Sequence, residues 1–268
     1  MVKFKLDLHT HTSDFIHLFF TNPHKERYIV SLLDILFKKQ GNLVLGIANF
    51  NDDSRYEKVI QIIKKLPKKY DVNYRFKECF ISISKSNQTI HFVKADEIDT
   101  EKGHILIIGH NGKIKKRNLK EVLKEAHKNH CIVIASHPLH DFAVGHFIIK
   151  KMSLSKEELI KNKKQIDAIE LDSYFPKDWK KIKKISKNEK IPIVSESDAH
   201  FLDEFFRSYF ELKGLNFKNP SIFKKSLKKA LKRTIKLHAQ RYNFTAEYKH
   251  ILQVYFEKLG KRLHILQY

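Results

Sequence analysis

The sequence is poor in the residues that interrupt or cross-link a chain. Its 268 residues include only 8 glycines and 6 prolines, and 42% are hydrophobic, which excludes collagen-like, low-complexity and disordered classes. The two cysteines, Cys79 and Cys131, are far apart and belong to no Cys-x-x-Cys pair, which excludes a disulfide scaffold and a cysteine-rich zinc module. We therefore expect a packed globular protein in a reducing compartment.

Long uncharged apolar runs are missing as well. No run approaches the roughly 18–20 residues that a membrane span needs. Near the N-terminus, Lys5, Asp7 and His9 interrupt the apolar stretch that a signal peptide would require. These absences predict a cytoplasmic location and no membrane partner.

Acidic residues are scarce relative to basic ones. There are 30 Asp and Glu against 52 Lys and Arg, which gives a formal net charge of +22. A field of this sign attracts polyanions, so nucleic acid or nucleotides are the predicted partner class. A lysine-rich host proteome would produce the same charge and stays open as the alternative.

Short apolar runs alternate with longer segments of helical period, a pattern typical of repeated βα units around a mainly parallel sheet. The predicted strands are residues 2–8, 43–48, 89–93, 105–108, 132–135, 168–171 and 191–194. The predicted helices are residues 27–39, 54–65, 119–129, 156–163 and 178–188. This alternation and the chain length favour a closed or nearly closed α/β barrel, with a doubly wound open sheet as the alternative.

The C-terminal part of the sequence is strongly basic. From residue 213 to 241 there are ten basic residues and no acidic one. Phe223, Leu227 and Leu231 share one helical face and lysines occupy the other, which predicts an amphipathic basic helix. Its charged face is either simply solvated or a contact for nucleic acid, an acidic partner or a membrane.

A last helix is predicted at residues 246–258, with Thr245 as its N-cap. Its apolar and aromatic side chains indicate that it docks, either on the barrel of its own chain or on a protein partner such as a second subunit. We therefore divide the chain into a barrel at residues 1–240 and a C-terminal helical extension at residues 241–268.

Histidines and acids follow the predicted strands, where barrel active sites are built. His9 and His11 follow the first strand with one residue between them. In extended backbone both imidazoles therefore point to one side and can bind one metal ion. Asp198 and His200 repeat this spacing after the last predicted strand.

Two more segments fit the same pattern. His137 closes the run at residues 132–135, and Glu97 and His104 bracket a short polar connection that contains Gly103. If these strands are neighbours, their ends converge on one mouth. The mixed imidazole and carboxylate ligands suit zinc, manganese or iron, and their number exceeds what one tetrahedral ion needs.

Four segments between residues 3 and 200 resemble, in order and spacing, the motifs of the PHP family, the polymerase and histidinol phosphatase metallophosphoesterases. They are Asp7-Leu8-His9-Thr10-His11-Thr12, Glu97-Ile98 with Gly103-His104-Ile105-Leu106, Ser136-His137-Pro138 and Ser197-Asp198-Ala199-His200. The resemblance implies a distorted (β/α)7 barrel with two or three divalent ions at the C-terminal ends of its strands. It also implies three ligand sets: His9, His11, Glu97 and Asp198 for one ion, Glu97, His104 and His137 for a second, and Asp14 and His200 for a third.

The sequence departs from this family at the third ion. The family usually has an Asp-His pair after the second strand, where this chain has Asn49 and Phe50. Phenylalanine cannot ligate a metal. The third site is therefore either empty or weak, or a nearby group completes it, with His17 preferred over the other candidates, His24, Asp52 and Asp53.

The resemblance and the charge together predict a metal-dependent phosphoesterase in which a metal-activated water hydrolyses a phosphoester, with a nucleic acid or nucleotide as the favoured substrate. Asp198 and His200 are the predicted catalytic residues, with His200 as general acid and Arg207 as a phosphate contact. The alternatives are a small-metabolite phosphatase of the histidinol-phosphate type and a non-catalytic subunit of a nucleic-acid-processing assembly.

Weaker candidates complete the set. Glu170 is either a metal ligand or a buried structural acid, the latter being favoured. Three further residues are candidate phosphate contacts: Lys94, Arg55 and His140. Three aromatic residues either stack on a base or pack in the core: Tyr174, Phe175 and Trp179.

Overall fold

The computed structural model describes residues 2–12, 23–51, 54–66, 68–139, 142–144, 147–150, 153–173, 176–233 and 235–241. The predicted helix at residues 246–258 lies outside this part of the chain. So do several candidate residues: Asp14, His17, Asp52, Asp53, His140, Tyr174 and Phe175. For His24 the structure describes the backbone and not the side chain. No helix among the described residues is long and apolar enough to cross a membrane.

Within the described residues, eleven strands form one mixed sheet in the order β11-β10-β7-β6-β5-β2-β1-β12-β13, with β4 on β5 and β3 on β4. The strands are β1 Lys3–Thr10, β2 Asn42–Phe50, β3 Asp71–Asn73, β4 Phe80–Lys85, β5 Gln88–Thr100, β6 Gly103–Ile108, β7 Ile132–Ala135, β10 Ala168–Asp172, β11 Ile193–Glu196, β12 Tyr209–Lys213 and β13 Lys236–His238. A separate hairpin consists of β8 Phe142–Val144 and β9 Phe147–Lys150. The helices are α1 Pro23–Lys38, α2 Arg55–Ile63, α3 Leu119–Lys128, α4 Lys156–Lys161, α5 Trp179–Glu189 and α6 Pro220–Leu231.

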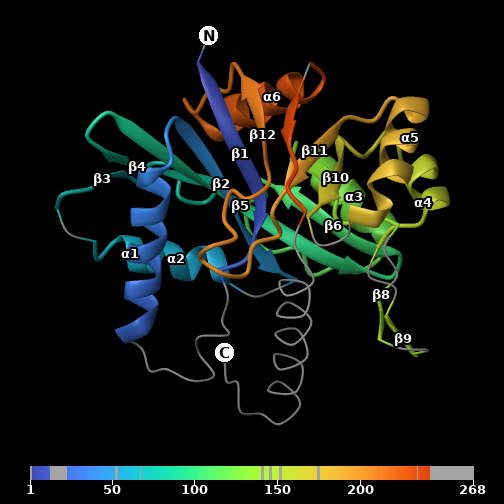
Figure 1. The fold of residues 1–268 in the computed structure, drawn as a ribbon, viewed down its shortest axis with the longest axis horizontal. Coiled ribbons are helices and arrows are strands. Elements are labelled where there is room, and N and C mark those ends of the chain that lie inside the picture. Colours follow the sequence, from blue (N-terminus) through green and yellow to red (C-terminus); the bar gives the residue numbers. More distant parts are fainter. Residues whose placement is uncertain are drawn as a thin grey trace.

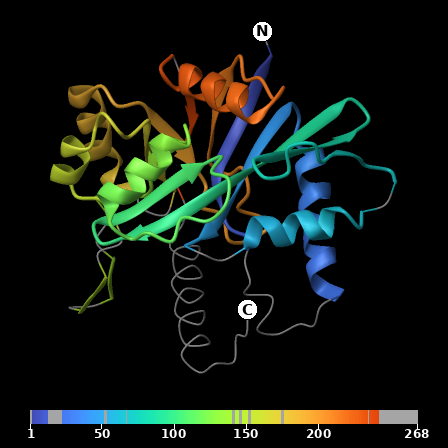
Figure 2. The same cartoon turned by 180° about the vertical axis from the view of Figure 1, so that it is seen from behind.

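The sheet curls into a nearly closed barrel. Thr10, at the end of β1, forms a parallel bridge with Ala199, and the backbone N–H of His11 donates to the Ala199 carbonyl at 2.7 Å. In Figures 1 and 2, α1 and α2 flank one side of the barrel, α3 to α5 flank the other, and α6 lies across the end where the chain begins. The distorted α/β barrel predicted from the sequence is confirmed.

Strand residues are buried on both faces of the sheet, as expected for strands covered by helices. On β2, Val44 and Ala48 point into the barrel, where they join Leu6 and Leu8 of β1. The alternate residues Leu43, Leu45 and Ile47 pack outside against α1 and α2. The continuous apolar run of β2 follows from this double burial.

The connection between Glu97 and His104 differs from the prediction. Both residues lie within strands, because β5 and β6 form an antiparallel hairpin in which Ile98 pairs with Ile105. Gly103 closes its turn with φ +131°, and a Cβ there would lie 2.3 Å from the Ser153 carbonyl carbon. Only glycine fits this turn, because a side chain would be strained and would clash with backbone.

His91 on β5 makes the stability of the barrel depend on pH. Its ring stacks on Phe217 at 3.7 Å between centroids, its Nδ1 lies 2.7 Å from the Ser82 hydroxyl, and burial lowers its pKa to about 4. Because the folded state disfavours the protonated imidazole, the free energy of unfolding falls as pH drops from about 6.5 to about 4, by about 3 kcal/mol at pH 4. We expect the His91→Gln variant to lose this pH dependence. The difference in free energy of unfolding between wild type and variant, measured with urea, should therefore change between pH 7 and pH 4. A constant difference would contradict the assignment.

Candidate metal centre

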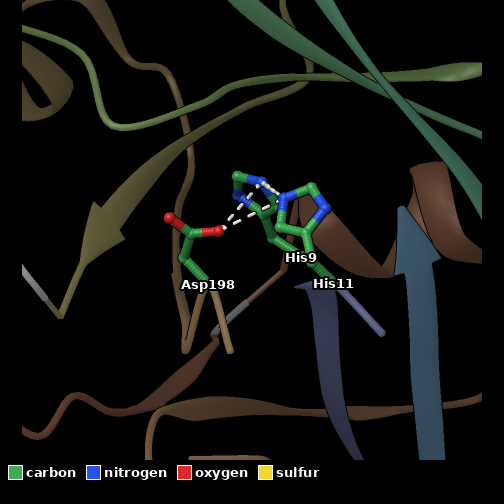
Figure 3. A group of neighbouring side chains, drawn as sticks. All are labelled: His9, His11 and Asp198. Atoms are coloured by element: carbon green, nitrogen blue, oxygen red, sulfur yellow. Dashed lines mark hydrogen bonds and ion pairs between the residues drawn. The ribbon is translucent and has the colours of Figure 1, made fainter. Parts of the chain in front are cut away.

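Two ligand groups meet at the C-terminal ends of the central strands. The first consists of His9, His11 and Asp198, all buried. The two Nε2 atoms lie 3.2 Å apart, and each lies 3.4 Å from Oδ1 of Asp198 (Figure 3). Their nitrogen and oxygen atoms thus converge on one point.

The second group consists of Glu97, His104 and His137, which are also buried. His104 Nδ1 lies 2.8 Å and His137 Nε2 3.0 Å from Oε1 of Glu97, and the two nitrogens are 3.3 Å apart. The hairpin of β5 and β6 supplies two of these side chains and the end of β7 supplies the third.

Glu97 connects the two groups. Its Oε2 lies 3.2 Å from His11 Nε2 and its Oε1 lies 3.5 Å from His9 Nε2, while Oε1 also faces the second group. One carboxylate therefore reaches four imidazoles, which is the position that a ligand shared by two ions requires.

A β-bulge turns His9 toward this centre. Leu6 and Leu8 both point into the barrel, so simple alternation would turn His9 outward. The pairing of β1 with β2 shifts register between Asp7 and Thr10, and the extra residue reverses the alternation. Gly46 on β2 makes the bulge possible, since a Cβ there would lie 2.1 Å from the Leu8 carbonyl oxygen.

Asp7 anchors the loop that carries Asp198. Its buried carboxylate accepts hydrogen bonds from the backbone N–H of Ser197 (3.0 Å), the Ser197 hydroxyl (2.6 Å) and the backbone N–H of Phe206 (2.8 Å). Burial raises the pKa of Asp7 to about 7, although these hydrogen bonds oppose the shift. In the sequence, the only signal for this role is that Asp7 belongs to the first motif.

Two of the candidate ligands have strained backbones. His137 has φ +27° and Asp198 has φ +47°, values that residues other than glycine rarely adopt. Such strain costs about 1–3 kcal/mol per residue and persists where surrounding contacts fix the conformation. Here the His137 N–H donates to Glu170 at 2.9 Å, and His200 Nδ1 donates to the Asp198 carbonyl at 2.8 Å.

Glu170 supports the ligands from behind. Both of its carboxylate oxygens lie 3.1 Å from His9 Nδ1, and one also accepts the backbone N–H of His137. Glu196 lies in the same buried space, next to the Nδ1 side of His9. Because His9 directs Nε2 at Asp198 and Nδ1 at Glu170, Glu170 orients this imidazole, as carboxylates commonly do for metal-binding histidines.

Replacing Glu170 with glutamine is expected to weaken metal binding about 10- to 100-fold, because the amide cannot hold the His9 ring by charge. Competition with a fluorescent chelator would measure the change. The matched control is Glu189→Gln, which affects a surface pair with Lys163. Equal affinities in the two variants would show that Glu170 does not position the ligand.

The electrostatics of the centre suit a bound cation. Burial alone would raise the pKa of Glu97, but His104 and His9 hold it well below its usual range. Burial alone would lower the pKa of His104, but Glu97 and Asp99 raise it to about 9. Asp198 Oδ1 is buried and has His9 Nε2 and His11 Nε2 at 3.4 Å. Imidazole nitrogens that face one another beside a buried carboxylate are the donor set expected for a divalent ion.

The third pair of ligands that the resemblance expects is replaced by Asn49 and Phe50, and neither side chain offers a ligand to the two metal groups. Phe50 pairs in register with Glu97, and its ring lies edge-on to His104 at 5.6 Å. Asn49 faces the outside of the sheet, where its amide donates to Asp96 (3.1 Å) and its oxygen accepts the Tyr56 N–H (2.8 Å). Asn49 thus fixes the start of α2 instead of facing the metal groups.

His200 lies beside the first group, with its ring 4.7 Å from that of His11. Its Nδ1–H donates to the Asp198 carbonyl at 2.8 Å. Its partner in the expected third ligand set, Asp14, is outside the described residues.

The remaining sequence candidates have other partners. Arg207 donates from Nε to the Asp203 carbonyl at 2.8 Å and pairs with the Asp203 carboxylate. Lys94 faces outward on β5 and contacts Glu57 at 2.7 Å. Trp179 donates to the Asp172 carbonyl at 2.7 Å and packs in the core, and Arg55 is buried in the first turn of α2.

Comparison with known proteins gives a structural likeness and no sequence match. No protein-family model matches the chain, and no curated protein matches its sequence. The solved structure of PsfC from Pseudomonas syringae is similar with a TM-score of 0.63 at 10% identity, over 97% of this chain and 100% of that one.

A two-domain protein from Bacteroides vulgatus, described as containing a predicted PHP-like metal-dependent phosphoesterase, is similar with a TM-score of 0.53 at 13% identity. The match covers 89% of this chain and 65% of that one. The lesion-specific endonuclease PfuEndoQ from Pyrococcus furiosus has a TM-score of 0.46 at 16% identity, over 88% of this chain and 57% of that one. The chain thus has the mixed α/β, barrel-shaped fold seen in PsfC and in the PHP-like protein.

Proposed function

We propose that this chain is a metal-dependent phosphoesterase of the PHP type. The observation that carries the proposal is the pair of buried ligand groups that share Glu97 at the mouth of the barrel. The order of the four sequence motifs and the likeness to a barrel described as PHP-like support it. A fold alone does not determine an activity, so the proposal depends mainly on the two ligand groups.

His9, His11, Glu97 and Asp198 would hold one divalent ion, and Glu97, His104 and His137 would hold the second. Paired divalent ions of this kind lower the pKa of a water and neutralise charge on phosphoryl oxygens. We assign no third ion, because Phe50 occupies the position of the expected ligand.

The side chains around the ions have separate tasks. Glu170 keeps the proton of His9 on Nδ1 and thereby presents Nε2 to the mouth. His200, whose Nδ1–H donates to the Asp198 carbonyl, would as the imidazolium give its Nε2 proton to the departing oxygen and become neutral. This proton transfer would make hydrolysis depend on His200 without removing metal from the other ligands.

The substrate we favour is a nucleic acid or a nucleotide. The net charge of +22 attracts phosphate-rich molecules. A cavity of about 400 Å³ is lined by residues that include Leu139, two residues after His137, and Leu154, whose backbone lies next to Gly103. Its lining includes three lysines and no acidic residue: Lys156, Lys181 and Lys184. Apolar side chains together with lysines suit a nucleobase and its phosphate.

The test is a hydrolysis screen on metal-stripped protein supplied in turn with manganese, zinc or iron. We expect metal-dependent release of nitrophenol from bis(p-nitrophenyl) phosphate and faster, salt-sensitive cleavage of a single-stranded oligonucleotide. Preference for a small monoester with little salt dependence would favour the metabolite phosphatase. A protein that binds no metal and hydrolyses none of these esters would contradict the proposal and indicate a non-catalytic subunit.

A further inference from the structure

The helix α6 presents a strongly basic surface that the metal centre does not use. Six exposed residues form this surface, called the α6 basic face: Lys218, Lys225, Lys229, Lys232, Arg233 and Lys236. No acidic residue occurs between residues 213 and 241. Within the described residues, the nearest acidic partner recorded for any of the six is Glu211, 3.8 Å from Lys236.

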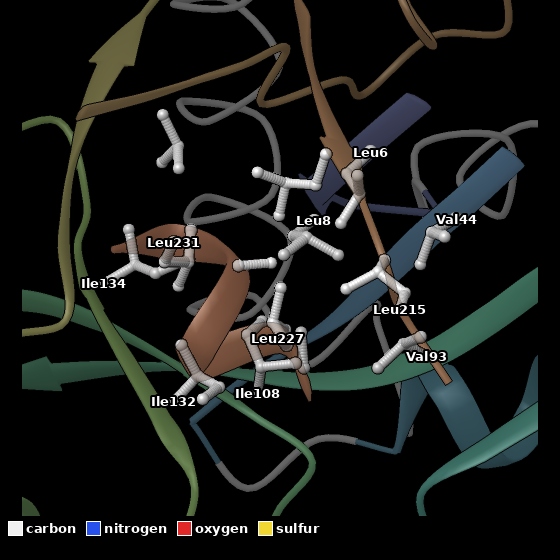
Figure 4. Packing of buried hydrophobic residues seen from close by; sticks show 14 of the residues in the cluster. Leu6, Leu8, Val44, Val93, Ile108, Ile132, Ile134, Leu215, Leu227 and Leu231 are labelled. Atoms are coloured by element: carbon white, nitrogen blue, oxygen red, sulfur yellow. The ribbon is translucent and has the colours of Figure 1, made fainter. Parts of the chain in front are cut away.

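The other side of α6 explains why the basic face points outward. Phe223, Leu227 and Leu231 are buried, and Figure 4 shows Leu227 and Leu231 among core residues of the barrel that include Leu8. Asn219 caps the helix by accepting the Ile222 N–H at 2.9 Å. Packing therefore fixes how the helix is rotated.

Two lysines hold the flanks of the helix and are not part of the basic face. Lys224 donates to the carbonyl of Asn129 at 2.7 Å, and Lys228 pairs with Asp167 at 2.9 Å. Asp167 directly precedes β10, whereas Glu170, which contacts His9, lies three residues further along the strand. The helix thus covers the end of the barrel opposite the metal groups.

The distance between the two ends excludes a shared small substrate. The six residue steps from Lys3 to His9 on β1 span about 20 Å at ~3.3 Å per residue. In Figure 1, α6 lies at the end of the barrel where β1 begins. His9 is the last but one residue of β1 and so belongs to the opposite end. A phosphoester bound at the metal groups would not reach the α6 basic face.

We propose that the α6 basic face binds the phosphate backbone of a nucleic acid, separately from the metal centre. Lys225, Lys229 and Lys232 follow one stripe of the helix over about 10 Å, which allows contacts to successive phosphates. Lysine and arginine contacts of this kind give affinity without sequence preference. A membrane surface fits less well, because membrane-binding helices insert an apolar face, and that of α6 is already buried in the barrel.

The test compares two triple variants of the full chain that remove equal charge from exposed helical lysines. One variant carries Lys225→Gln, Lys229→Gln and Lys232→Gln on α6, and the control carries Lys120→Gln, Lys124→Gln and Lys128→Gln on α3. Fluorescence anisotropy with a labelled single strand of about 20 nucleotides, in EDTA and from about 50 to 200 mM salt, measures affinity without hydrolysis.

We expect the α6 variant to bind at least about tenfold more weakly at low salt and to lose about 2 from the slope of log K against log salt, since each lost contact to a single strand removes about 0.7. The control should match wild type. Equal losses in both variants, no loss in either, or no binding by wild type would overturn the proposal. Binding to phosphatidylserine vesicles instead of DNA would overturn it in favour of a membrane contact. Bis(p-nitrophenyl) phosphate hydrolysis, which tests only the metal centre, should be the same in all three proteins.

Discussion

Replacing His9 and His11 together with alanine is expected to abolish phosphoester hydrolysis, with a loss of at least about 10³-fold in kcat/KM. The two Nε2 atoms lie 3.2 Å apart and face Asp198, so their removal leaves the first ligand group with carboxylates alone. The charge stabilisation that a bound ion gives to a phosphoryl group is worth several kcal/mol, which sets the size of the loss.

The double variant should remain a folded barrel and retain at most one ion per chain, held by the second group. Far-UV circular dichroism and metal analysis by mass spectrometry measure the two properties. The matched control is His127→Ala with His130→Ala, because these histidines lie at the end of α3, away from both groups. Wild-type hydrolysis by the His9 and His11 variant would contradict the assignment of the site.

Replacing Glu97 with glutamine is also expected to abolish hydrolysis, because it should weaken the binding of both ions. The carboxylate lies between 2.8 and 3.5 Å from nitrogens of four imidazoles. An amide keeps the shape but removes the charge that both groups share, so we expect no tightly bound ion and no detectable hydrolysis. The nearby His104 would also lose the carboxylate that raises its pKa to about 9.

Comparing the metal content of these two variants tests whether Glu97 is a ligand of both ions. Glu78→Gln, an identical change at an exposed position, should keep full metal content and activity. If Glu97→Gln lost only one ion while the His9 and His11 variant lost both, Glu97 would belong to a single group. Full metal content in Glu97→Gln would remove the basis for a shared ligand.

The sequence predicts the positions of the strands that build the site because their burial leaves a strong pattern. All seven predicted strands and the five predicted helices of the barrel occur, and their bounds lie within a few residues of those expected except for β5, which continues seven residues beyond its expected end to Thr100. Continuous apolar runs such as that of β2 are buried on both faces, and helices such as α3 carry apolar residues on one face only. The motif residues follow the strand ends and therefore meet.

Other features could not be read from local pattern. The strands β12 and β13 are short, and the long antiparallel hairpin of β5 and β6 depends on a glycine turn with φ +131°. The bulge that turns His9 inward depends on the close approach of β1 to Gly46. The support of His9 by Glu170 joins residues 161 positions apart. Each of these rests on contacts between distant segments.

The position of α6 determines what its positive charge can bind. The sequence predicts an amphipathic helix with one buried face, and α6 has that form. Because α6 covers the far end of the barrel, its lysines do not reach a substrate held at the metal groups. In the proposed function, the lysines of the cavity lined by Leu139 and Leu154 contact that substrate instead.

Anomalous diffraction from a crystal grown with manganese would show whether two cations share Glu97 at the mouth of the barrel. We expect two anomalous peaks about 3.5–4 Å apart, one bound by His9, His11 and Asp198, the other by His104 and His137, with Glu97 contacting both. A map with no peak among these residues would rule out the shared site.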